Sequence, residues 1–207
     1  MKVLLINGSP REKGCTFTAL SEAAASLVNN SIEIEIFHIG NRPVYGCAAC
    51  RSCRETHRCV YDGDCSNELA EKMLAADGII IGSPVYYAGP NGALCALLDR
   101  AFFSSQKELF AYKPAAAAVS CRRAGSTAAL DRIIKYFTIA NMTVVGSSYW
   151  SMVHGNTPEE VRKDLEGMQI MRRLGENMAF LLKTIQAGKA TVSPNAPEVS
   201  VATNFIR

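Results

Sequence analysis

The sequence lacks a long apolar run, an excess of one charge and any hydrolase motif. No apolar stretch approaches the roughly 18 residues of a membrane-spanning helix. The chain opens on only four consecutive apolar residues, Val3 to Ile6, whereas a secretory signal needs roughly 7–15. The 22 Lys and Arg residues nearly balance the 19 Asp and Glu residues, and no Ser–His–Asp, paired-carboxylate or HExxH pattern occurs. We therefore expect a cytoplasmic protein that binds neither membrane nor nucleic acid.

The one unusual feature of the composition is cysteine. The 207 residues are 48% hydrophobic and 20% charged, which excludes disordered, collagenous and coiled-coil chains. Eight cysteines are present, and five of them lie between Cys47 and Cys65. Thiols stay reduced in the cytosol, so this crowding favours metal ligands or redox groups over a disulfide framework.

Short apolar runs alternate with helical spacing along the chain. The runs 3–6, 78–82, 115–119 and 143–146 are typical of buried strands, while 32–36 alternates strictly and indicates a strand with one wet face at a sheet edge. Five strands separated by helices predict an α/β fold with a doubly wound, five-stranded parallel sheet and helices on both faces. We expect one domain over 1–187 that contains a cysteine-rich insertion over 40–65, followed by a tail over 188–207.

A capping box marks the last helix. Thr157-Pro158-Glu159-Glu160 places a capping hydroxyl, an N1 proline and two acidic residues at its start. One apolar face then predicts a single continuous helix, through Val161, Leu165, Met168, Met171, Leu174, Met178, Leu181 and Ile185.

In such sheets ligands bind beyond the carboxyl ends of the strands. After the first strand, the segment 8–16 combines glycines, hydroxyls and Arg11 ahead of a helix N-terminus, which suits a phosphate. It is neither a Walker loop, because five residues separate Gly8 from Gly14 and Cys15 follows, nor a GxGxxG fingerprint. The alternative is an ordinary turn with a helix cap.

Two more loops carry candidate groups. After the third strand, the segment 83–90 contains Pro84, which stiffens a loop where a planar heterocycle could rest beside a tyrosine. After the fourth strand, the segment 121–127 is a glycine-containing turn with two arginines, suited to an anion or a polar ring edge. The alternatives are a surface turn with core tyrosines and two solvated charges.

Four cysteines have ligand spacing. Cys47, Cys50, Cys53 and Cys59 follow a C-x2-C-x2-C-x5-C pattern, so their thiolates can converge on one centre. An iron–sulfur cluster, zinc and unmetallated thiols all remain open, although zinc ribbons usually have two well-separated pairs. The remaining thiols Cys65, Cys95 and Cys121 are expected to pack as small apolar residues.

At this point the residues resemble a known family. Gly8-Ser9-Pro10-Arg11 with Gly14 and Thr16, then Ser83-Pro84-Val85-Tyr86, then Leu98-Asp99-Arg100 resemble the flavodoxin-like NAD(P)H-dependent FMN reductases over roughly residues 1–150. The cysteine-rich insertion resembles that of the iron–sulfur flavoprotein branch. The combination of the first loop with the Pro-Val-Tyr loop is specific to this family.

The resemblance implies a noncovalent FMN and assigns residues to it. The phosphate would lie on Ser9, Arg11, Cys15 and Thr16. The ring would rest on Pro84, Val85, Tyr86 and Tyr87, with Arg123, Gly125 and Ser126 on its far side. Cys47, Cys50, Cys53 and Cys59 would hold a [4Fe–4S] cluster. The chain departs from the family at Cys15, where Ser or Asn is common.

The function implied is an NAD(P)H-dependent FMN reductase that passes electrons through FMN to a small-molecule or protein acceptor. FMN would carry the chemistry, so no catalytic side chain is expected. The alternative is an iron–sulfur flavoprotein that moves electrons between ferredoxin-like carriers and FMN. A third reading is a non-catalytic module with structural zinc.

The family implies a homodimer or homotetramer. Trp150 and His154 either face a flavin or are packing and surface residues.

Overall fold

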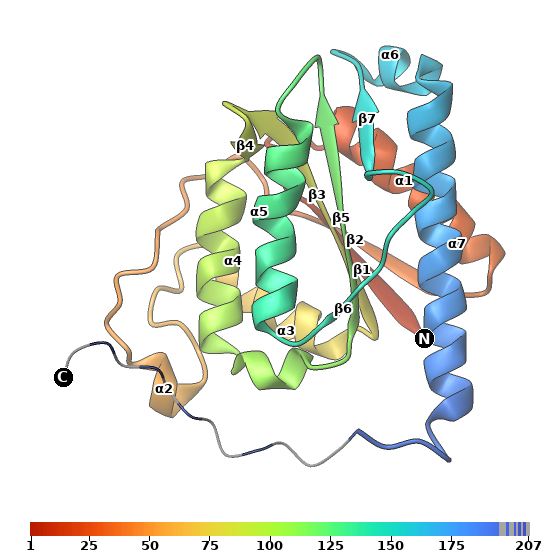
Figure 1. Cartoon of the computed structure of the whole chain (residues 1–207). Coiled ribbons are helices and arrows are strands. Elements are labelled where there is room, and N and C mark those ends of the chain that lie inside the picture. The colour runs from red at the N-terminus through yellow and green to blue at the C-terminus, as the bar shows by residue number, and fades with distance from the viewer. Residues whose placement is uncertain (195–197, 199–200, 202, 204, 206–207) are drawn as a thin grey trace.

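The computed structural model describes residues 1–194, 198, 201, 203 and 205 and places one parallel sheet at the centre (Figure 1). The strand order is β2-β1-β3-β5-β6. These strands are β1 (Lys2–Asn7), β2 (Glu33–His38), β3 (Gly78–Tyr86), β5 (Pro114–Cys121) and β6 (Thr143–Val144). The predicted doubly wound α/β sheet with helices on both faces is confirmed.

The predicted number of five strands is wrong, because the described residues form a sheet of seven strand segments. In the run 143–146 only Thr143 and Val144 pair with β5, and pairing resumes at β7 (Met152–His154), also parallel to β5. The segment Ser83–Tyr86, expected as a loop, continues β3 and turns back into β4 (Gly89–Pro90). Both differences arise from backbone pairing at the sheet's rim, which leaves no mark in hydrophobic periodicity.

Helices cover both faces of the sheet (Figure 1). α1 and α7 pack against each other on one face, and α3, α4 and α5 cover the other. The bounds are α1 (Cys15–Asn29), α2 (Cys53–Thr56), α3 (Ser66–Ala75), α4 (Gly92–Ser104), the 3-10 helix η1 (Lys107–Phe110), α5 (Ser126–Ile139), α6 (Pro158–Lys163) and α7 (Leu165–Gly188).

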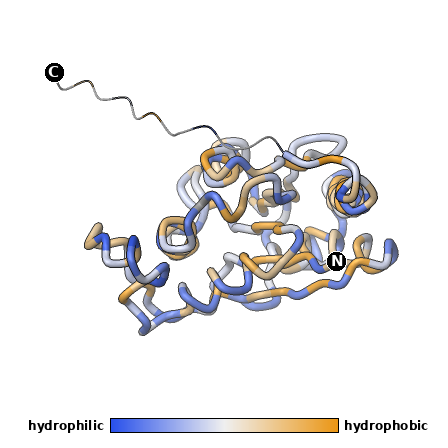
Figure 2. Tube along the Cα trace, turned by 90° about the horizontal axis from the view of Figure 1, so that it is seen from below, coloured by the Kyte–Doolittle hydropathy of each residue, from blue (hydrophilic) through white to orange (hydrophobic). Residues whose placement is uncertain are grey.

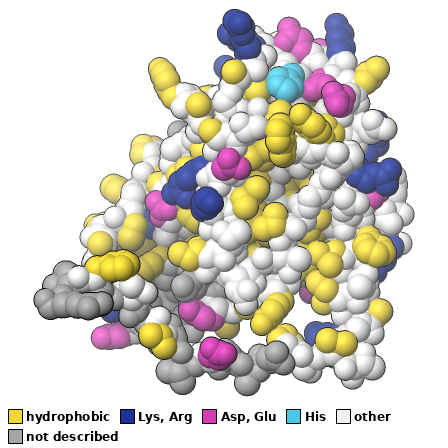
Figure 3. Space-filling view, viewed as in Figure 1, with side chains coloured by type: hydrophobic (Ala, Val, Ile, Leu, Met, Phe, Trp, Pro, Cys, Tyr) yellow, Lys and Arg dark blue, Asp and Glu magenta, His cyan; other side chains and the backbone are white. Residues whose placement is uncertain are grey.

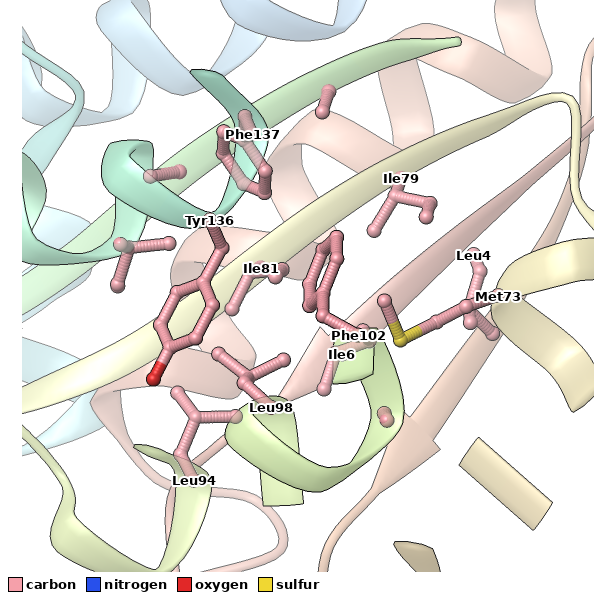
Figure 4. Packing of buried hydrophobic residues seen from close by; sticks show 14 of the residues in the cluster. Leu4, Ile6, Met73, Ile79, Ile81, Leu94, Leu98, Phe102, Tyr136 and Phe137 are labelled. Atoms are coloured by element: carbon pink, nitrogen blue, oxygen red, sulfur yellow. The ribbon is translucent and has the colours of Figure 1, made fainter. Parts of the chain in front are cut away.

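The two hydrophobic cores follow the two-residue period of the strands. In β1, Val3 and Leu5 face α1 and α7, whereas Leu4 and Ile6 face α3 and α4; all four are fully buried. Hydrophobic residues therefore run along the central strands (Figure 2). Figure 4 shows the second core, where aromatic rings of α4 and α5 meet isoleucines of β1 and β3.

The predicted edge strand is confirmed. β2 ends the sheet, and most of its side chains are partly exposed. Its Glu35 forms ion pairs with Lys2 at 2.5 Å and Lys72 at 2.6 Å. Charges on an edge strand oppose pairing with another chain.

The predicted single C-terminal helix is interrupted. Thr157 caps α6 through its Oγ1, which accepts a hydrogen bond from Glu160 N at 3.3 Å. The helix ends at Lys163, and Asp164 caps a second helix by accepting from Gly167 N at 2.9 Å. Leu165, the first residue of this second helix, is 77% exposed, so its predicted place on one continuous apolar face is wrong.

Within the part of the chain that the structure describes, no helix has both the length and the apolar character to cross a bilayer. The division into a domain over 1–187 and a tail over 188–207 stays a prediction, because much of that tail lies outside the described residues.

Lys113 generates a test of the fold by pH. Its Nζ donates to Met73 O at 2.7 Å and Leu74 O at 2.9 Å, near the end of α3. Burial lowers its pKa to about 8. Because this folded-state pKa lies below the unfolded value of about 10.4, the unfolded chain binds more protons between these values, and stability rises with pH there.

We therefore expect the unfolding free energy of wild type, relative to Lys113→Met, to rise between pH 7.5 and 9.5 in urea titrations. The control Lys135→Met removes an exposed lysine and should show no such slope. If the difference in unfolding free energy between wild type and Lys113→Met stayed constant or fell over this range, it would contradict a lowered pKa at Lys113.

Candidate functional site at the carboxyl edge of the sheet

The loop between β1 and α1 is held by hydrogen bonds of its own side chains. Asn7 Nδ2 donates to Glu12 O at 2.8 Å, and Asn7 Oδ1 accepts from Ser9 N at 3.2 Å. Ser9 Oγ accepts from Arg11 N at 3.1 Å, and the Ser9 carbonyl contacts His38 Nε2 at 2.8 Å. The loop is thus preorganised as a tight turn around its polar groups.

The helix that follows has an open N-terminus. Gly14 is the N-cap of α1 and supplies no side-chain cap. First-turn N–H groups have no partner within a helix, and the dipole of this 15-residue helix favours an anion there. Arg11 is exposed in the loop beside it. The geometry therefore suits a phosphate group.

Two of the predicted phosphate residues turn their side chains elsewhere. The Cys15 thiol donates to Gly155 O at 3.8 Å, and burial raises its pKa, which favours the neutral thiol. Thr16 Oγ1 pairs with Ser120 Oγ at 2.9 Å and is buried. Cys15 and Thr16 thus offer backbone N–H groups to the loop, whereas Ser9 and Arg11 lie in the loop itself.

The second predicted loop is a hairpin. Tyr87 and Ala88 both have positive φ, 49° and 59°, as a two-residue type I′ turn requires. Such angles cost free energy for residues other than glycine. Pro84 and Val85 are half-buried, Tyr86 is 46% exposed, and Tyr87 stands fully in solvent. The hairpin therefore presents tyrosine at the edge of the sheet.

The third predicted loop packs against this hairpin. Gly125 has φ +89°, and a Cβ there would lie 2.7 Å from Ala88 Cα, so only glycine fits. Arg123 is exposed. Ser126 is buried, and its Oγ donates to Met152 Sδ at 3.1 Å, so this hydroxyl faces the core.

Asn91 joins the hairpin to the first loop. Its Nδ2 donates to Gly8 O at 2.8 Å, and its Oδ1 caps α4 by accepting from Ala93 N at 3.2 Å. Together with the Gly125–Ala88 contact, this bond brings all three predicted loops to one edge. Asn7 and Asn91 were missed from the sequence, although an Asn after a buried strand and an Asn before a helix are both capping signals.

Trp150 and His154 lie in different parts of the structure. His154 is paired with Cys121 in register at the carboxyl end of β7, and its Nδ1 lies 3.7 Å from Asp164 Oδ2. It therefore lies at the same edge as the three loops. Trp150 precedes β7 and lines a hollow beside α5.

The four spaced cysteines line one pocket with Arg100 and Phe103. Cys47 and Cys50 are exposed, and Cys53 and Cys59 are partly buried. Burial first, and then the nearby thiols of Cys50, Cys59 and Cys47, raise the pKa of Cys53. Among the described residues, no three His, Cys, Asp or Glu side chains lie close enough together to bind one metal ion. The donor set is nevertheless four thiols around one hollow, which is the chemistry that iron–sulfur clusters require.

Cys65, Cys95 and Cys121 differ in burial. Cys121 is buried, as predicted, whereas Cys65 and Cys95 are only partly buried.

A fully buried arginine organises the cysteine segment. Arg100, in α4, pairs with Asp64, whose side chain is 3% exposed. Burial opposes ionisation of Asp64, but hydrogen bonds from Arg100 and from two backbone N–H groups outweigh it and lower its pKa. Arg100 also donates to Tyr61 O at 2.5 Å, to Tyr45 O at 3.2 Å and to Cys59 Sγ at 3.2 Å. One side chain thus connects α4 to four points of the segment.

The fold and this edge define a doubly wound α/β protein with an open loop, suited to an anion, at a topological switch point. Residues 1–157 match the family described as NADPH-dependent FMN reductase. The chain therefore belongs to the NADPH-dependent FMN reductase family, a class of FMN-dependent oxidoreductases.

Similar proteins agree with this placement. An iron–sulfur flavoprotein of Methanocaldococcus jannaschii is 32% identical over 196 residues, covering 90% of this chain and 100% of the relative. The structure of RosB with bound 8-demethyl-8-formylriboflavin-5'-phosphate matches with a TM-score of 0.72 at 16% identity, over 100% of this chain and 94% of RosB. An archaeal flavodoxin matches with a TM-score of 0.59 at 15% identity, over 88% and 99%. The flavodoxin-like fold is thus confirmed.

Arg100 generates a prediction about the segment it holds. Arg100→Met leaves Asp64 buried without its cation, so we expect a loss of about 3–5 kcal/mol in unfolding free energy and faster proteolysis between Arg42 and Tyr61. Urea titration and limited trypsin digestion measure the two effects.

The double variant Arg100→Met/Asp64→Asn removes the unpaired charge and should recover part of the stability while the segment stays sensitive to protease. Equal protease resistance of wild type and Arg100→Met would contradict the anchoring role.

Proposed function

We propose that the protein passes electrons from NAD(P)H through bound FMN to a small-molecule or protein acceptor. The observation that carries this proposal is the meeting of three loops around the uncapped N-terminus of α1, at the edge where doubly wound folds bind their ligands. Membership of the NADPH-dependent FMN reductase family supports both the cofactor and the reductant.

The residues present fit FMN. Ser9, Arg11 and the backbone N–H groups of Cys15 and Thr16 would hold the phosphate. The hairpin and the third loop would contact the ring, through Pro84, Val85, Tyr86, Tyr87, Arg123, Gly125 and the backbone N–H, rather than the hydroxyl, of Ser126. FMN, when bound, supplies hydride acceptance and electron delivery in one- or two-electron steps.

The side chains of this chain serve to position the cofactor. Asn7 shapes the first loop, Asn91 joins it to the hairpin, and Gly125 permits the third loop to close on Ala88. The exposed tyrosines leave this edge open to a second planar molecule. We propose no general acid or base.

A test removes the only arginine of the first loop. Arg11→Ala should weaken FMN binding about 10- to 100-fold, because a charge-assisted contact to phosphate contributes about 1.5–3 kcal/mol. Fluorescence titration of apoprotein with FMN measures the affinity, and riboflavin, which lacks the phosphate, should bind both proteins alike.

Arg173→Ala, which removes an exposed arginine of α7, is the control and should bind FMN like wild type. Unchanged FMN affinity in Arg11→Ala would contradict the assigned loop. Failure of the wild type to oxidise NADPH or NADH with any acceptor would contradict the reductase activity.

A second candidate function follows from the cysteine pocket. We propose that Cys47, Cys50, Cys53 and Cys59 hold a [4Fe–4S] cluster, and that the protein then exchanges electrons with ferredoxin-like carriers. The convergence of the four thiols on one pocket supports this proposal, as does the name of the Methanocaldococcus relative. Arg100 would donate a hydrogen bond to Cys59 Sγ, one of the four ligand sulfurs. Hydrogen bonds to ligand sulfurs tune the reduction potential of a cluster.

Metal analysis distinguishes the alternatives. Anaerobically purified protein should contain about four iron and four acid-labile sulfides per chain, with a broad absorbance beyond the flavin bands. Cys53→Ser should lose the iron, whereas Cys95→Ser, outside the pocket, should keep it. Zinc in place of iron, or flavin bands without metal, would contradict the cluster and leave the reductase as the function.

The remaining expectations stay proposals. We propose a homodimer or homotetramer in the cytoplasm, with no nucleic acid or membrane as partner.

A further inference from the structure

A hollow lies at the outer edge of β5, where the last strand of the sheet is interrupted. The connection from Val144 to Met152 has seven residues, 145–151, whereas β5 has only three, 116–118, between its paired residues Ala115 and Val119. Four extra residues therefore bulge out of the sheet. The hollow lies between this bulge and α5.

The bulge is held open by α7. Ser147 Oγ donates to Ile170 O at 2.7 Å, and Asn177 Nδ2 donates to Gly146 O at 2.9 Å. At the two ends, Val145 N donates to Ala115 O at 2.8 Å and Val119 N donates to Ser151 O at 3.0 Å. The backbone is thus pinned on both sides, and the hollow is a built feature of the fold.

The size and lining suit a small molecule. The hollow measures about 360 Å³, within the range of roughly 300–1,000 Å³ typical of ligand sites. Its apolar lining comes from β5, β6, α5 and the first residue of the bulge, namely Ala117, Leu130, Ile134, Val144 and Val145. Figure 3 shows apolar side chains gathered on this face, between α5 and the connection toward α7.

Two aromatic rings stand at the bulge. Tyr149 and Trp150 are 55% and 59% exposed, with ring centroids 4.9 Å apart and planes tilted by 57°. Each of these exposed rings, beside an apolar floor, offers a face or an edge against which another ring can pack.

Charge selects among ligands. The polar lining consists of Thr127, Asp131, Ser147 and Ser151, and none of the described residues that line the hollow is Lys, Arg or His. The neighbouring Arg132 is turned to Tyr136, with its guanidinium 4.5 Å from that ring, and pairs with Asp99 at 3.5 Å. Asp131 is thus the only charged side chain among the described lining residues, and its carboxylate would repel a phosphate, sulfonate or carboxylate.

We propose that this hollow binds a neutral or cationic planar aromatic molecule, with its ring against Tyr149 and Trp150 and any positive or N–H edge toward Asp131. The site is separate from the proposed FMN site, because the hollow contains none of the first-loop groups that would bind the phosphate of FMN. The proposal does not depend on electron transfer.

Calorimetry with three ring probes tests the charge selection on protein saturated with FMN. 2-Naphthol is neutral, N-methylquinolinium is cationic and 2-naphthalenesulfonate is anionic, with similar ring size. We expect the first two to bind with Kd below about 1 mM, and the sulfonate to bind about threefold more weakly than the neutral probe. Binding of no probe, or equal binding of the sulfonate, would overturn the proposal.

Variants locate the binding. Trp150→Ala should weaken both favoured probes about tenfold, because an aromatic pair contributes up to about 1.5 kcal/mol beyond buried area. Phe180→Ala, which removes a 73% exposed ring of α7, is the matched control and should change nothing. Asp131→Asn should weaken the binding of N-methylquinolinium about threefold and leave that of 2-naphthol unchanged. The difference in affinity between N-methylquinolinium and 2-naphthalenesulfonate should therefore become smaller.

Trp150 is the only tryptophan, so its indole N–H gives a single NMR signal. That signal should shift on addition of 2-naphthol. An unmoved indole signal, or equal losses of affinity in Trp150→Ala and Phe180→Ala, would place the binding elsewhere and overturn the proposal.

Discussion

The parallel pairing of β1 with β3 and of β3 with β5 brings the carboxyl ends of three strands to one edge of the sheet. Every loop that carries candidate chemistry for FMN begins there. The pairing is stabilised by side chains buried on both faces, so the strands cannot slip by one residue without exchanging their two cores. The position of the site is therefore a consequence of the register of the sheet.

Helix α4 connects this edge with the cysteine pocket. Asn91 caps the helix and contacts the first loop, while Arg100, nine residues further on, holds the cysteine segment. At 1.5 Å per residue the two residues lie about 14 Å apart along the helix axis. The cysteine segment has few buried side chains of its own. A buried cation that needs several acceptors thus orders the segment where hydrophobic packing cannot.

Some features of the site could be predicted from the sequence, because they depend on local patterns. The buried runs 3–6 and 115–119 and the alternating strand at 32–36 all became strands where periodicity placed them. The three loops were found because doubly wound sheets bind ligands after their strands. The hairpin at Tyr87-Ala88 was missed, since these residues adopt positive φ without glycine. The interruption of the last strand was missed because hydrogen bonds from α7 hold the bulge, across the chain.

The sequence by itself determined the class of fold, the edge at which the candidate site lies and the family, because hydrophobic period and loop motifs act over a few neighbouring residues. Only the tertiary structure decided which side chains face that edge. Thr16 and Ser126 turn to Ser120 and Met152, since a buried hydroxyl takes the nearest partner in space. It also decided that Arg100 links the cysteines to α4 and that Trp150 lines a separate hollow, because both contacts join residues distant in the chain.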